Sequence, residues 1–284
     1  MPSSSATDRT GKLYVVGTPI GNLSDITLRA IETLKSVDRV LAEDTRRTRT
    51  LLNHLGITGK PLASIEAHVS EQRLKGLLHF LENGDVLALV TDAGMPAVSD
   101  PGAKVVHLAR EAGFGVEVIP GPSALTAAIA LSGLVEGPFY FAGFLPRQGS
   151  RRTRAIERLM QPGAAAVLFE AGNRTSATLR DLTGIRPERR VAVCRELTKL
   201  HEEVATGTLS ELAQLEREWR GEVVIVLAEE QAPERNADVD CGLDEAALLR
   251  ELEGGKSVRD LLEASGLTGR KRRALYAKLL ELQR

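Results

Sequence analysis

Short apolar runs alternate with segments of helical periodicity along most of this chain of 284 residues. A run of four to eight apolar residues has the length of a buried strand, and apolar residues spaced three and four apart indicate a helix. The first five strand-like runs lie at residues 13–16, 37–43, 62–65, 86–90 and 116–119. A helical pattern follows the first run, at Leu28, Ile31 and Leu34. Strands that alternate with helices predict an α/β fold.

A second series of strand-like runs begins after a change of composition near residues 133–138. These runs lie at 139–144, 165–169, 190–194, 204–207 and 221–228. A polar segment then leads into a C-terminal part that is helical by pattern and ends in a basic helix. We therefore expect a disordered tail at 1–10, an N-terminal α/β domain at 11–135, a second α/β domain at 136–230, a linker at 231–242, and a small all-helical, helix-turn-helix-like domain at 243–284 that is a candidate for RNA binding.

Three of the predicted strands end in loops rich in glycine and proline. These are GTPIGN at 17–22, TDAGMPAVSDPG at 91–102 and PGPSALTAA at 120–128. One such loop is equally well explained as a tight strand-to-helix turn, with Asp100 near a helix cap. Open α/β sheets bind ligands at the carboxyl ends of their strands, so three such loops in one domain favour a shared pocket rim.

The formal net charge is only −1, so the overall charge does not indicate a nucleic-acid partner. Local clusters of charged residues must provide that evidence. The segment EDTRRTR at 43–49 is either a solvated helix start with Asp44 or Thr45 at the N-cap, or a carboxylate pair beside an arginine cluster that binds phosphate. Five arginines follow at 147–158, and the basic stretch at 270–273 lies in the last predicted helix. That helix is either a solvated face or a contact to the nucleic-acid backbone.

Composition narrows the class of protein. Hydrophobic residues make up 43% and charged residues 26% of the chain, as in ordinary globular proteins. Two isolated cysteines, Cys194 and Cys241, suit neither a disulfide framework nor a zinc site. The sequence has neither a signal-peptide pattern nor an apolar run long enough to cross a membrane. We expect a cytoplasmic protein without a membrane partner.

Several motifs together resemble one known family. LYVVGTPIGNLSDIT, AEDTRRT, VTDAGMPAVSDPG, PGPSALTAA, GFLPR and RELTK occur in this order over residues 12–228. They closely resemble the ribosomal RNA small subunit methyltransferase I family of the tetrapyrrole methylase superfamily. The resemblance implies two α/β domains with S-adenosylmethionine in the cleft between them. It also implies a homodimer that methylates the 2′-hydroxyl of a cytidine in 16S rRNA of the small ribosomal subunit, near the P site.

The resemblance also implies which residues meet the cofactor. By motif these are Thr18, Pro19, Thr91, Asp92, Ala93, Gly94, Met95, Val98, Ser123, Ala124, Ala171, Cys194, Gly221 and Glu222. This sequence departs from the family pattern in three places. Met95 occupies a threonine position, FEAGNR at 169–174 lacks the tyrosine and histidine of the family, and residues 47–49 are more basic than the family's segment after EDTR.

The chemistry requires no metal, because the sulfonium carries its own leaving group. Proton removal from the ribose hydroxyl would assist transfer, and the candidate bases are Glu43, Asp44 and Asp100, whose alternative role is helix capping. The candidate RNA-binding residues are Arg46, Arg49, Arg151, Arg152, Arg154, Arg270, Lys271, Arg272 and Arg273. A tetrapyrrole methyltransferase and a non-catalytic RNA-binding protein on the same scaffold remain as alternatives. A nicotinamide oxidoreductase is disfavoured, since the GxGxxG fingerprint is absent.

Overall fold

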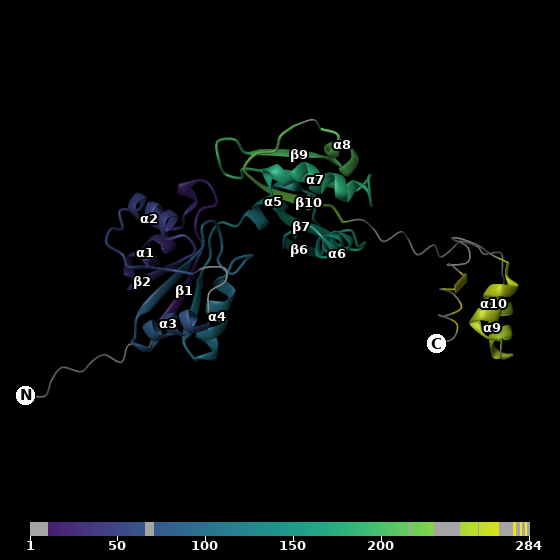
Figure 1. Cartoon of the computed structure of the whole chain (residues 1–284), viewed down its shortest axis with the longest axis horizontal. Coiled ribbons are helices and arrows are strands. Elements are labelled where there is room, and N and C mark those ends of the chain that lie inside the picture. The colour runs from purple at the N-terminus through teal and green to yellow at the C-terminus, as the bar shows by residue number, and fades with distance from the viewer. Residues whose placement is uncertain are drawn as a thin grey trace, which may run out of the picture. The chain divides into compact units, whose positions relative to one another are not determined.

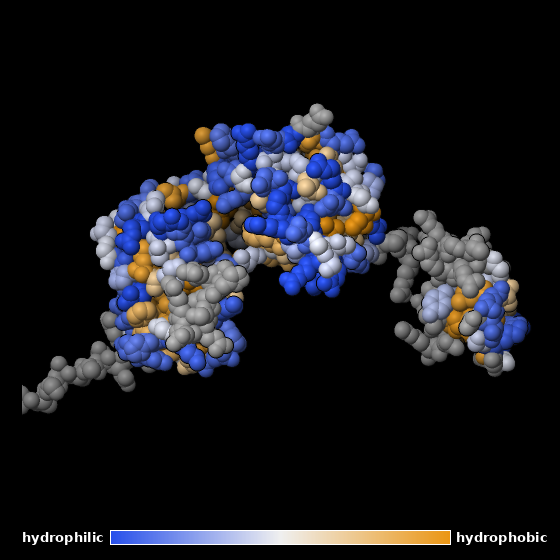
Figure 2. All heavy atoms as spheres, in the orientation of Figure 1, coloured by the Kyte–Doolittle hydropathy of each residue, from blue (hydrophilic) through white to orange (hydrophobic). Residues whose placement is uncertain are grey.

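The computed structural model describes residues 11–65, 71–215, 217–229, 245–254 and 256–266, with residues 275, 276, 279 and 282. The chain divides into two compact units, residues 1–230 and 231–284. Among the described residues, no helix combines the length and hydropathy that a membrane crossing requires. The face of the first unit seen in Figure 2 is largely hydrophilic, with apolar residues in smaller groups.

The first unit contains a parallel five-stranded sheet (Figure 1). Its strands are β1 (Lys12–Val16), β2 (Arg39–Ala42), β3 (Leu62–Ser64), β4 (Val86–Val90) and β5 (Gly115–Ile119). The strand order is β3-β2-β4-β1-β5, and all four pairings are parallel. The predicted strands are confirmed. Because the strands are parallel, their carboxyl ends meet at one edge, where open α/β sheets bind ligands.

Helices cover both faces of this sheet. The helices α1 (Leu28–Ser36) and α2 (Thr45–His54) pack on one face, and α3 (Glu71–Glu82) and α4 (Gly102–Glu111) pack on the other. Alternate strand residues divide between the two cores, with Leu87 and Leu89 on the α3–α4 side and Ala88 and Val90 on the opposite side. A strand buried on both faces explains the uninterrupted apolar run at β4.

The second sheet is mixed, and its strand order is β6-β7-β10-β8-β9. The strands are β6 (Phe139–Phe144), β7 (Ala165–Ala171), β8 (Arg190–Arg195), β9 (Glu203–Thr208) and β10 (Glu222–Leu227). Only β6 and β7 are parallel neighbours. The helices α6 (Ser150–Leu159), α7 (Gly172–Thr183) and α8 (Leu209–Ala213) enclose one apolar core on this sheet. The two-sheet α/β architecture is therefore the predicted one.

The helix α5 (Ala124–Ser132) precedes the predicted boundary at residue 135 but packs on the second sheet. Ala128 is fully buried there, in one core with Val167, Ala192 and Val226. The helix therefore links the last loop of the first sheet to the packing of the second. The division at residue 135 stays a prediction, since both sheets belong to one compact unit.

Helix starts in the first unit follow the capping patterns of the sequence. Thr27 caps α1 by accepting the amide of Ala30 at 3.1 Å. The Asp44 side chain accepts the amide of Arg46 at 2.8 Å and caps α2, which confirms one of its two interpretations. A carboxylate in this position is stabilised by the free amides and the dipole of the helix start.

The second unit is described over two helices, α9 (Glu245–Glu253) and α10 (Val258–Ala264). Ser257 and Asp260 form a capping box at the start of α10. Leu248, Leu261 and Leu262 are buried in an apolar cluster of this unit. The helix-turn-helix assignment and the basic residues 270–273 lie outside the described residues, so both stay predictions.

An ion pair on the second sheet sets a pH dependence of stability. Arg217 donates to both carboxylate oxygens of Glu203, at 2.6 and 2.7 Å, and stacks on Trp219. The hydrogen bonds from Arg217, with a further one from Arg195, lower the pKa of Glu203 to about 2. We predict that Glu203→Gln lowers the free energy of unfolding at pH 7 by about 1–2 kcal/mol, after allowance for solvent screening of a partly exposed pair.

The sign of this effect follows from proton linkage. A lowered pKa stabilises the folded state above the unfolded-state value near 4.5 and loses that contribution as the pH falls towards 2. The difference between the variant and the wild type, measured by denaturant titration, should therefore narrow below pH 4.5. Glu218→Gln is the control, because its ion pair with Arg220 is exposed and should contribute little. A pH-independent difference for Glu203→Gln would contradict the prediction.

Candidate active site

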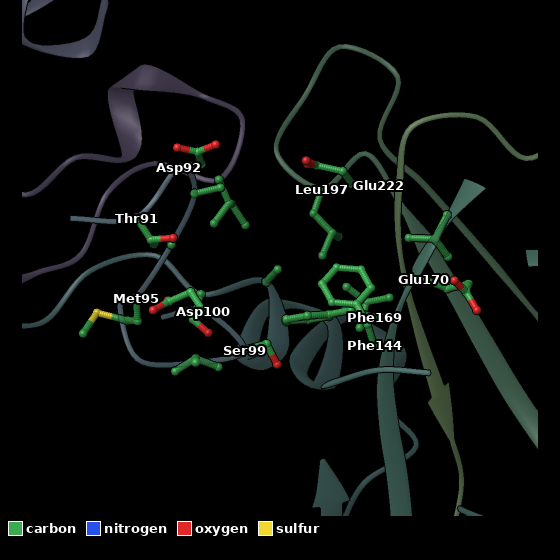
Figure 3. A pocket seen from close by; sticks show the side chains of 18 of the residues that line it. Thr91, Asp92, Met95, Ser99, Asp100, Phe144, Phe169, Glu170, Leu197 and Glu222 are labelled. Atoms are coloured by element: carbon green, nitrogen blue, oxygen red, sulfur yellow. The ribbon is translucent and has the colours of Figure 1, made fainter. Parts of the chain in front are cut away.

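A cavity of about 380 Å³ lies between the carboxyl ends of the first sheet and the second sheet. Figure 3 shows Thr91 and Asp92 on one side of it and Phe169 and Glu170 on the other. Its volume is in the range of small-molecule sites, which commonly lie at such strand ends. Most of the residues predicted to meet a cofactor line this cavity: Thr91, Asp92, Ala93, Gly94, Met95, Val98, Ser123, Ala124, Ala171, Gly221 and Glu222.

The central loop after β4 is held in a strained conformation. Ala97 and Ser99 have φ angles of 69° and 65°, a left-handed region that non-glycine residues seldom adopt. Asp100 stabilises the turn, because its Oδ1 accepts the amide of Ala97 at 2.9 Å and that of Gly102 at 2.7 Å. Strain of this kind clusters at functional sites, where the surrounding structure maintains it.

The first loop supports the central loop from behind. Thr18 and Gly94 exchange backbone hydrogen bonds of 2.9 and 3.1 Å, and the Thr18 hydroxyl donates to the carbonyl of Thr91 at 3.2 Å. Thr18 is only 2% exposed. Of this loop, Ile20 lines the cavity and Thr18 and Pro19 do not, so the contact of Thr18 and Pro19 with the cofactor stays a prediction. The carbonyls of Thr91 and Gly94 already accept hydrogen bonds from Thr18.

Two glycines allow the first and third loops to meet. A Cβ on Gly17 would lie 2.7 Å from the Cα of Gly121 and 2.7 Å from the sulfur of Met95. Backbone contact this close excludes any side chain at Gly17. Met95 thus packs its thioether against the same junction, where the family pattern has a threonine. Met95 therefore both fills the space beside Gly17 and lines the cavity.

Cys194 lies in a core and not on the cavity wall. Its side chain is fully buried among Ala128, Val167 and Val224 on the α5 face of the second sheet. Burial raises the pKa of its thiol to about 11. The alternation of β8 directs this side chain towards α5, and the contact of Cys194 with the cofactor stays a prediction.

The three candidate bases differ in their surroundings. Asp44 is an N-cap, and hydrogen bonds from Arg46 lower its pKa to about 2, so it is a poor proton acceptor and does not line the cavity. Glu43 lines the cavity and accepts the Thr91 hydroxyl at 2.7 Å. Asp100 lines it too, and its Oδ2 is buried without a hydrogen-bond partner among the described residues. A buried acceptor without a partner is costly, which singles out Asp100.

Asp92 is a further carboxyl group at the cavity. Its Oδ1 accepts the amide of Asp44 at 3.0 Å, and its Oδ2 lies 3.4 Å from Arg47. Burial raises its pKa, and the charge of Glu43 acts in the same direction. The motifs predict Asp92 only as a cofactor contact. No feature of the sequence distinguishes it as a carboxyl group with a raised pKa.

The structure separates the predicted RNA-binding arginines. Arg152 is largely buried and donates to Asp181 at 2.7 Å and to Thr178 at 3.0 Å, so its side chain already has partners within the protein. Its contact with RNA stays a prediction. Arg46, Arg49, Arg151 and Arg154 are exposed. Arg46 pairs with Asp44. Residues 270–273 lie outside the described part of the chain.

Sequence analysis missed several residues that line the cavity. Arg47 lies in the sequence between the predicted RNA-binding residues Arg46 and Arg49, and it is on the face of α2 that lines the cavity. Phe144 and Leu197 belong to the GFLPR and RELTK motifs, which carried the only signal for them. The loop that holds Leu197 is strained as well, with φ angles of 51° at Glu196 and 65° at Thr198. Its Thr198 hydroxyl accepts the amide of Asn22 at 3.0 Å.

The lining suits the chemistry of S-adenosylmethionine, a flat nucleoside joined to a cationic sulfonium and an amino-acid group. Apolar and aromatic side chains form one part of the wall. Carboxyl groups form another part, and these belong to Glu43, Asp92, Asp100, Glu170 and Glu222. The partnerless Oδ2 of Asp100 is an acceptor that a donor from a ligand or substrate would satisfy. The residues present therefore fit the group.

Comparisons with known proteins give the family. The model of tetrapyrrole (corrin/porphyrin) methylases matches residues 12–213. A ribosomal RNA small subunit methyltransferase I of Thermotoga maritima is 47% identical over 220 residues, which are 77% of this chain and 98% of that protein. The same-named protein of Neisseria meningitidis serogroup A is 40% identical over 273 residues, 94% of this chain and 92% of that protein.

A solved structure agrees with the fold. The uroporphyrin-III-C-methyltransferase of Thermus thermophilus aligns with a TM-score of 0.57 and 22% identity. The alignment covers 77% of this chain and 94% of that one. At this identity the likeness concerns the fold alone.

Proposed function

This chain belongs to the tetrapyrrole (corrin/porphyrin) methylase family and uses S-adenosylmethionine to methylate ribosomal RNA, and we propose that its target is the 2′-hydroxyl of a cytidine in 16S rRNA, near the P site. The observation that carries the proposal is the cavity at the strand ends. It is lined by most of the residues that the motifs assign to the cofactor, and it also holds a buried carboxylate oxygen and an arginine. The names of the relatives support ribosomal RNA as the substrate.

We assign cofactor binding to the central loop and to the ends of β7 and β10. When bound, S-adenosylmethionine supplies an activated methyl group attached to a sulfur that is a good leaving group. The protein holds a ribose in line with that group, and positioning of this kind contributes on the order of 7–11 kcal/mol to lowering a barrier. The strained turn at Ala97 and Ser99 keeps the loop in one conformation, which favours such positioning.

Asp100 is the general base in this proposal. Its Oδ1 is committed to the amides of Ala97 and Gly102, so the side chain cannot rotate freely. Its Oδ2 is buried and has no hydrogen-bond partner among the described residues, and in this proposal it accepts the proton of the ribose hydroxyl. Removal of that proton as the new bond forms accelerates a transfer by about 10²–10⁴-fold.

The substrate RNA meets the cavity beside α2. Arg47 lies at the wall, and Arg46 and Arg49 are exposed on the same helix. Arginine pairs with phosphate through several donors, and a structured RNA is recognised mainly through its backbone and through splayed-out bases. We further propose that the enzyme works in the cytoplasm and as a homodimer, as the resemblance implies. The mass of the protein in solution tests the dimer.

Two arginine substitutions should separate binding from folding. Arg49→Ala should weaken binding to small subunits and lower the slope of log K against log salt by about 1, because one phosphate contact is lost. Arg152→Ala should leave that slope unchanged and lower the free energy of unfolding by about 1–2 kcal/mol, since it breaks hydrogen bonds to Asp181 and Thr178. Salt-dependent binding and denaturant titrations measure both effects. An unchanged slope for Arg49→Ala would remove Arg49 from the RNA surface.

The substrate class is tested by transfer of label from S-adenosylmethionine. Small subunits and naked 16S rRNA from a strain that lacks the enzyme are offered in parallel with a tetrapyrrole. We expect label in one of the RNA samples and none in the tetrapyrrole. Label in the tetrapyrrole alone, or no label in a preparation that binds S-adenosylmethionine, would overturn the proposed substrate.

A further inference from the structure

One aromatic ring at the cavity is unusually open. Phe144 lines the cavity, yet it is 59% exposed. In Figure 3 it lies with Phe169 on the side of the cavity opposite Thr91 and Asp92. An open phenyl ring is unfavourable in water, so a ligand that covers it gains apolar burial.

An irregularity in the backbone of β6 determines the direction of this ring. The pairing of β6 with β7 is regular up to Phe141 and then shifts register before Phe144 meets Phe169. Gly143, between them, has a φ angle of 63°, and a Cβ there would lie 2.7 Å from the hydroxyl oxygen of Ser99. Bulges of this kind redirect side chains next to active sites. Gly143, the residue before Phe144, therefore lies against Ser99 of the strained central loop.

Neighbouring rings fix its orientation. The centroids of Phe144 and Phe169 are 5.5 Å apart at an interplanar angle of 60°, and Phe169 contacts Phe141 in a similar edge-on arrangement at 4.9 Å. Phe169 packs against the apolar core beneath the second sheet. An aromatic ring held by its neighbours offers a preorganised surface for a flat partner.

We propose that Phe144 is a positioning residue that stacks on the nucleobase of the target cytidine. The proposal rests on the proposed function. A flat heteroaromatic ring is the chemistry that fits, and either the RNA base or the adenine of the cofactor would supply it. The openness of Phe144 favours the base, because small-molecule ligands are mostly enclosed by their sites while a splayed-out base enters from outside. Arg47 on the wall of the same cavity provides a cation for the adjoining phosphate.

Steady-state kinetics with small subunits or 16S rRNA test the proposal. Base–aromatic stacking predicts that Phe144→Ala raises the KM for RNA roughly 5- to 150-fold. Phe144→Tyr, which keeps the ring, should restore a KM near that of the wild type, while Phe144→Leu, which keeps apolar bulk without a π face, should resemble alanine. The affinity for S-adenosylmethionine without RNA, measured by calorimetry, should remain the same in all variants.

A matched control separates stacking from the general loss of a surface ring. Phe139 lies on the same strand and is 44% exposed, but it does not line the cavity, so Phe139→Ala should leave the KM for RNA unchanged. Weaker cofactor binding with an unchanged KM for RNA would overturn the proposal and assign the ring to adenine. A Phe144→Leu variant with the same KM for RNA as Phe144→Tyr would also overturn it. This comparison remains valid even if the alanine variant folds poorly.

The outcome also distinguishes this inference from the proposed function. A wild-type enzyme that methylates RNA, together with a Phe144→Ala variant of unchanged KM, would overturn the stacking role alone. A wild-type enzyme that methylates no RNA would overturn both.

Discussion

Replacement of Asp100 by asparagine should lower kcat for methyl transfer by about 10²–10⁴-fold, the usual contribution of a general base. Asparagine keeps an oxygen in the Oδ1 position, so the hydrogen bonds from Ala97 and Gly102 can persist. It replaces the partnerless Oδ2 with an amide that cannot accept a proton. The loop should therefore keep its conformation while the proton acceptor is lost. Single-turnover rates at saturating cofactor measure the effect.

Two further measurements assign the loss to chemistry. The dissociation constant for S-adenosylmethionine should stay near the wild-type value in Asp100→Asn, because the loop is unchanged. Asp92→Asn is the matched control, since Asp92 is the other aspartate on the wall and has partners on both oxygens. It should reduce kcat less than Asp100→Asn does. A large loss in Asp92→Asn with a near-normal Asp100→Asn would transfer the role of base to Asp92, whose pKa is raised by burial.

Gly17→Ala should damage the site although Gly17 itself does not line the cavity. The new Cβ would lie within 2.8 Å of the backbone nitrogen of Gly121 and 2.7 Å from the sulfur of Met95, so the first and third loops must separate. Overpacking costs typically about 1–3 kcal/mol of stability. A shift of about 1 Å in a positioning element can lower the rate about 10²-fold. We expect both effects, in the denaturation midpoint and in kcat/KM.

The control for this substitution is another glycine. Gly76 lies within α3, and a Cβ there would have no heavy atom within 4 Å. Gly76→Ala should stabilise the protein by about 0.5–1 kcal/mol, because alanine is the better helix former. Its kcat/KM should remain that of the wild type. Full activity in Gly17→Ala would show that the contact between the first and third loops does not position the site.

The elements of the fold were predictable because their hydrophobic periodicities are strong. The run of β4 is apolar throughout, since helices cover both faces of its sheet, and the loops after β1, β4 and β5 carry glycine and proline that mark the strand ends. Parallel strands bring such loops to one edge, so a shared pocket follows from topology alone. The central-loop residues that the motifs assign to the cofactor line this pocket.

Side-chain direction was the part that the sequence could not provide. Thr18 belongs to a cofactor motif, but its hydroxyl turns inward to the carbonyls of the central loop. Cys194 alternates away from the cavity into the core, and Arg152 turns towards Asp181. Each direction depends on neighbours that are distant in the sequence. A run of arginines therefore predicts a charged helix without saying which member reaches the cavity, and here that member is Arg47.

Phe144 illustrates the same limit on the second sheet. The motif GFLPR marks the end of a strand, but the direction of the ring arises from a register shift between β6 and β7. Strand pairing is long-range, and the left-handed conformation of Gly143 has meaning only beside Ser99. Such features emerge when two segments meet, and a periodicity within one segment cannot reveal them.

The central claim that we propose is that this cavity directs a methyl group to the 2′-hydroxyl of one cytidine in 16S rRNA. The most direct test is to digest RNA labelled by the purified enzyme to nucleosides and to identify the methylated product by chromatography and mass spectrometry. We predict one labelled nucleoside, 2′-O-methylcytidine, from a single position of 16S rRNA. Label on a base, or on the ribose of another nucleoside, would contradict the claim.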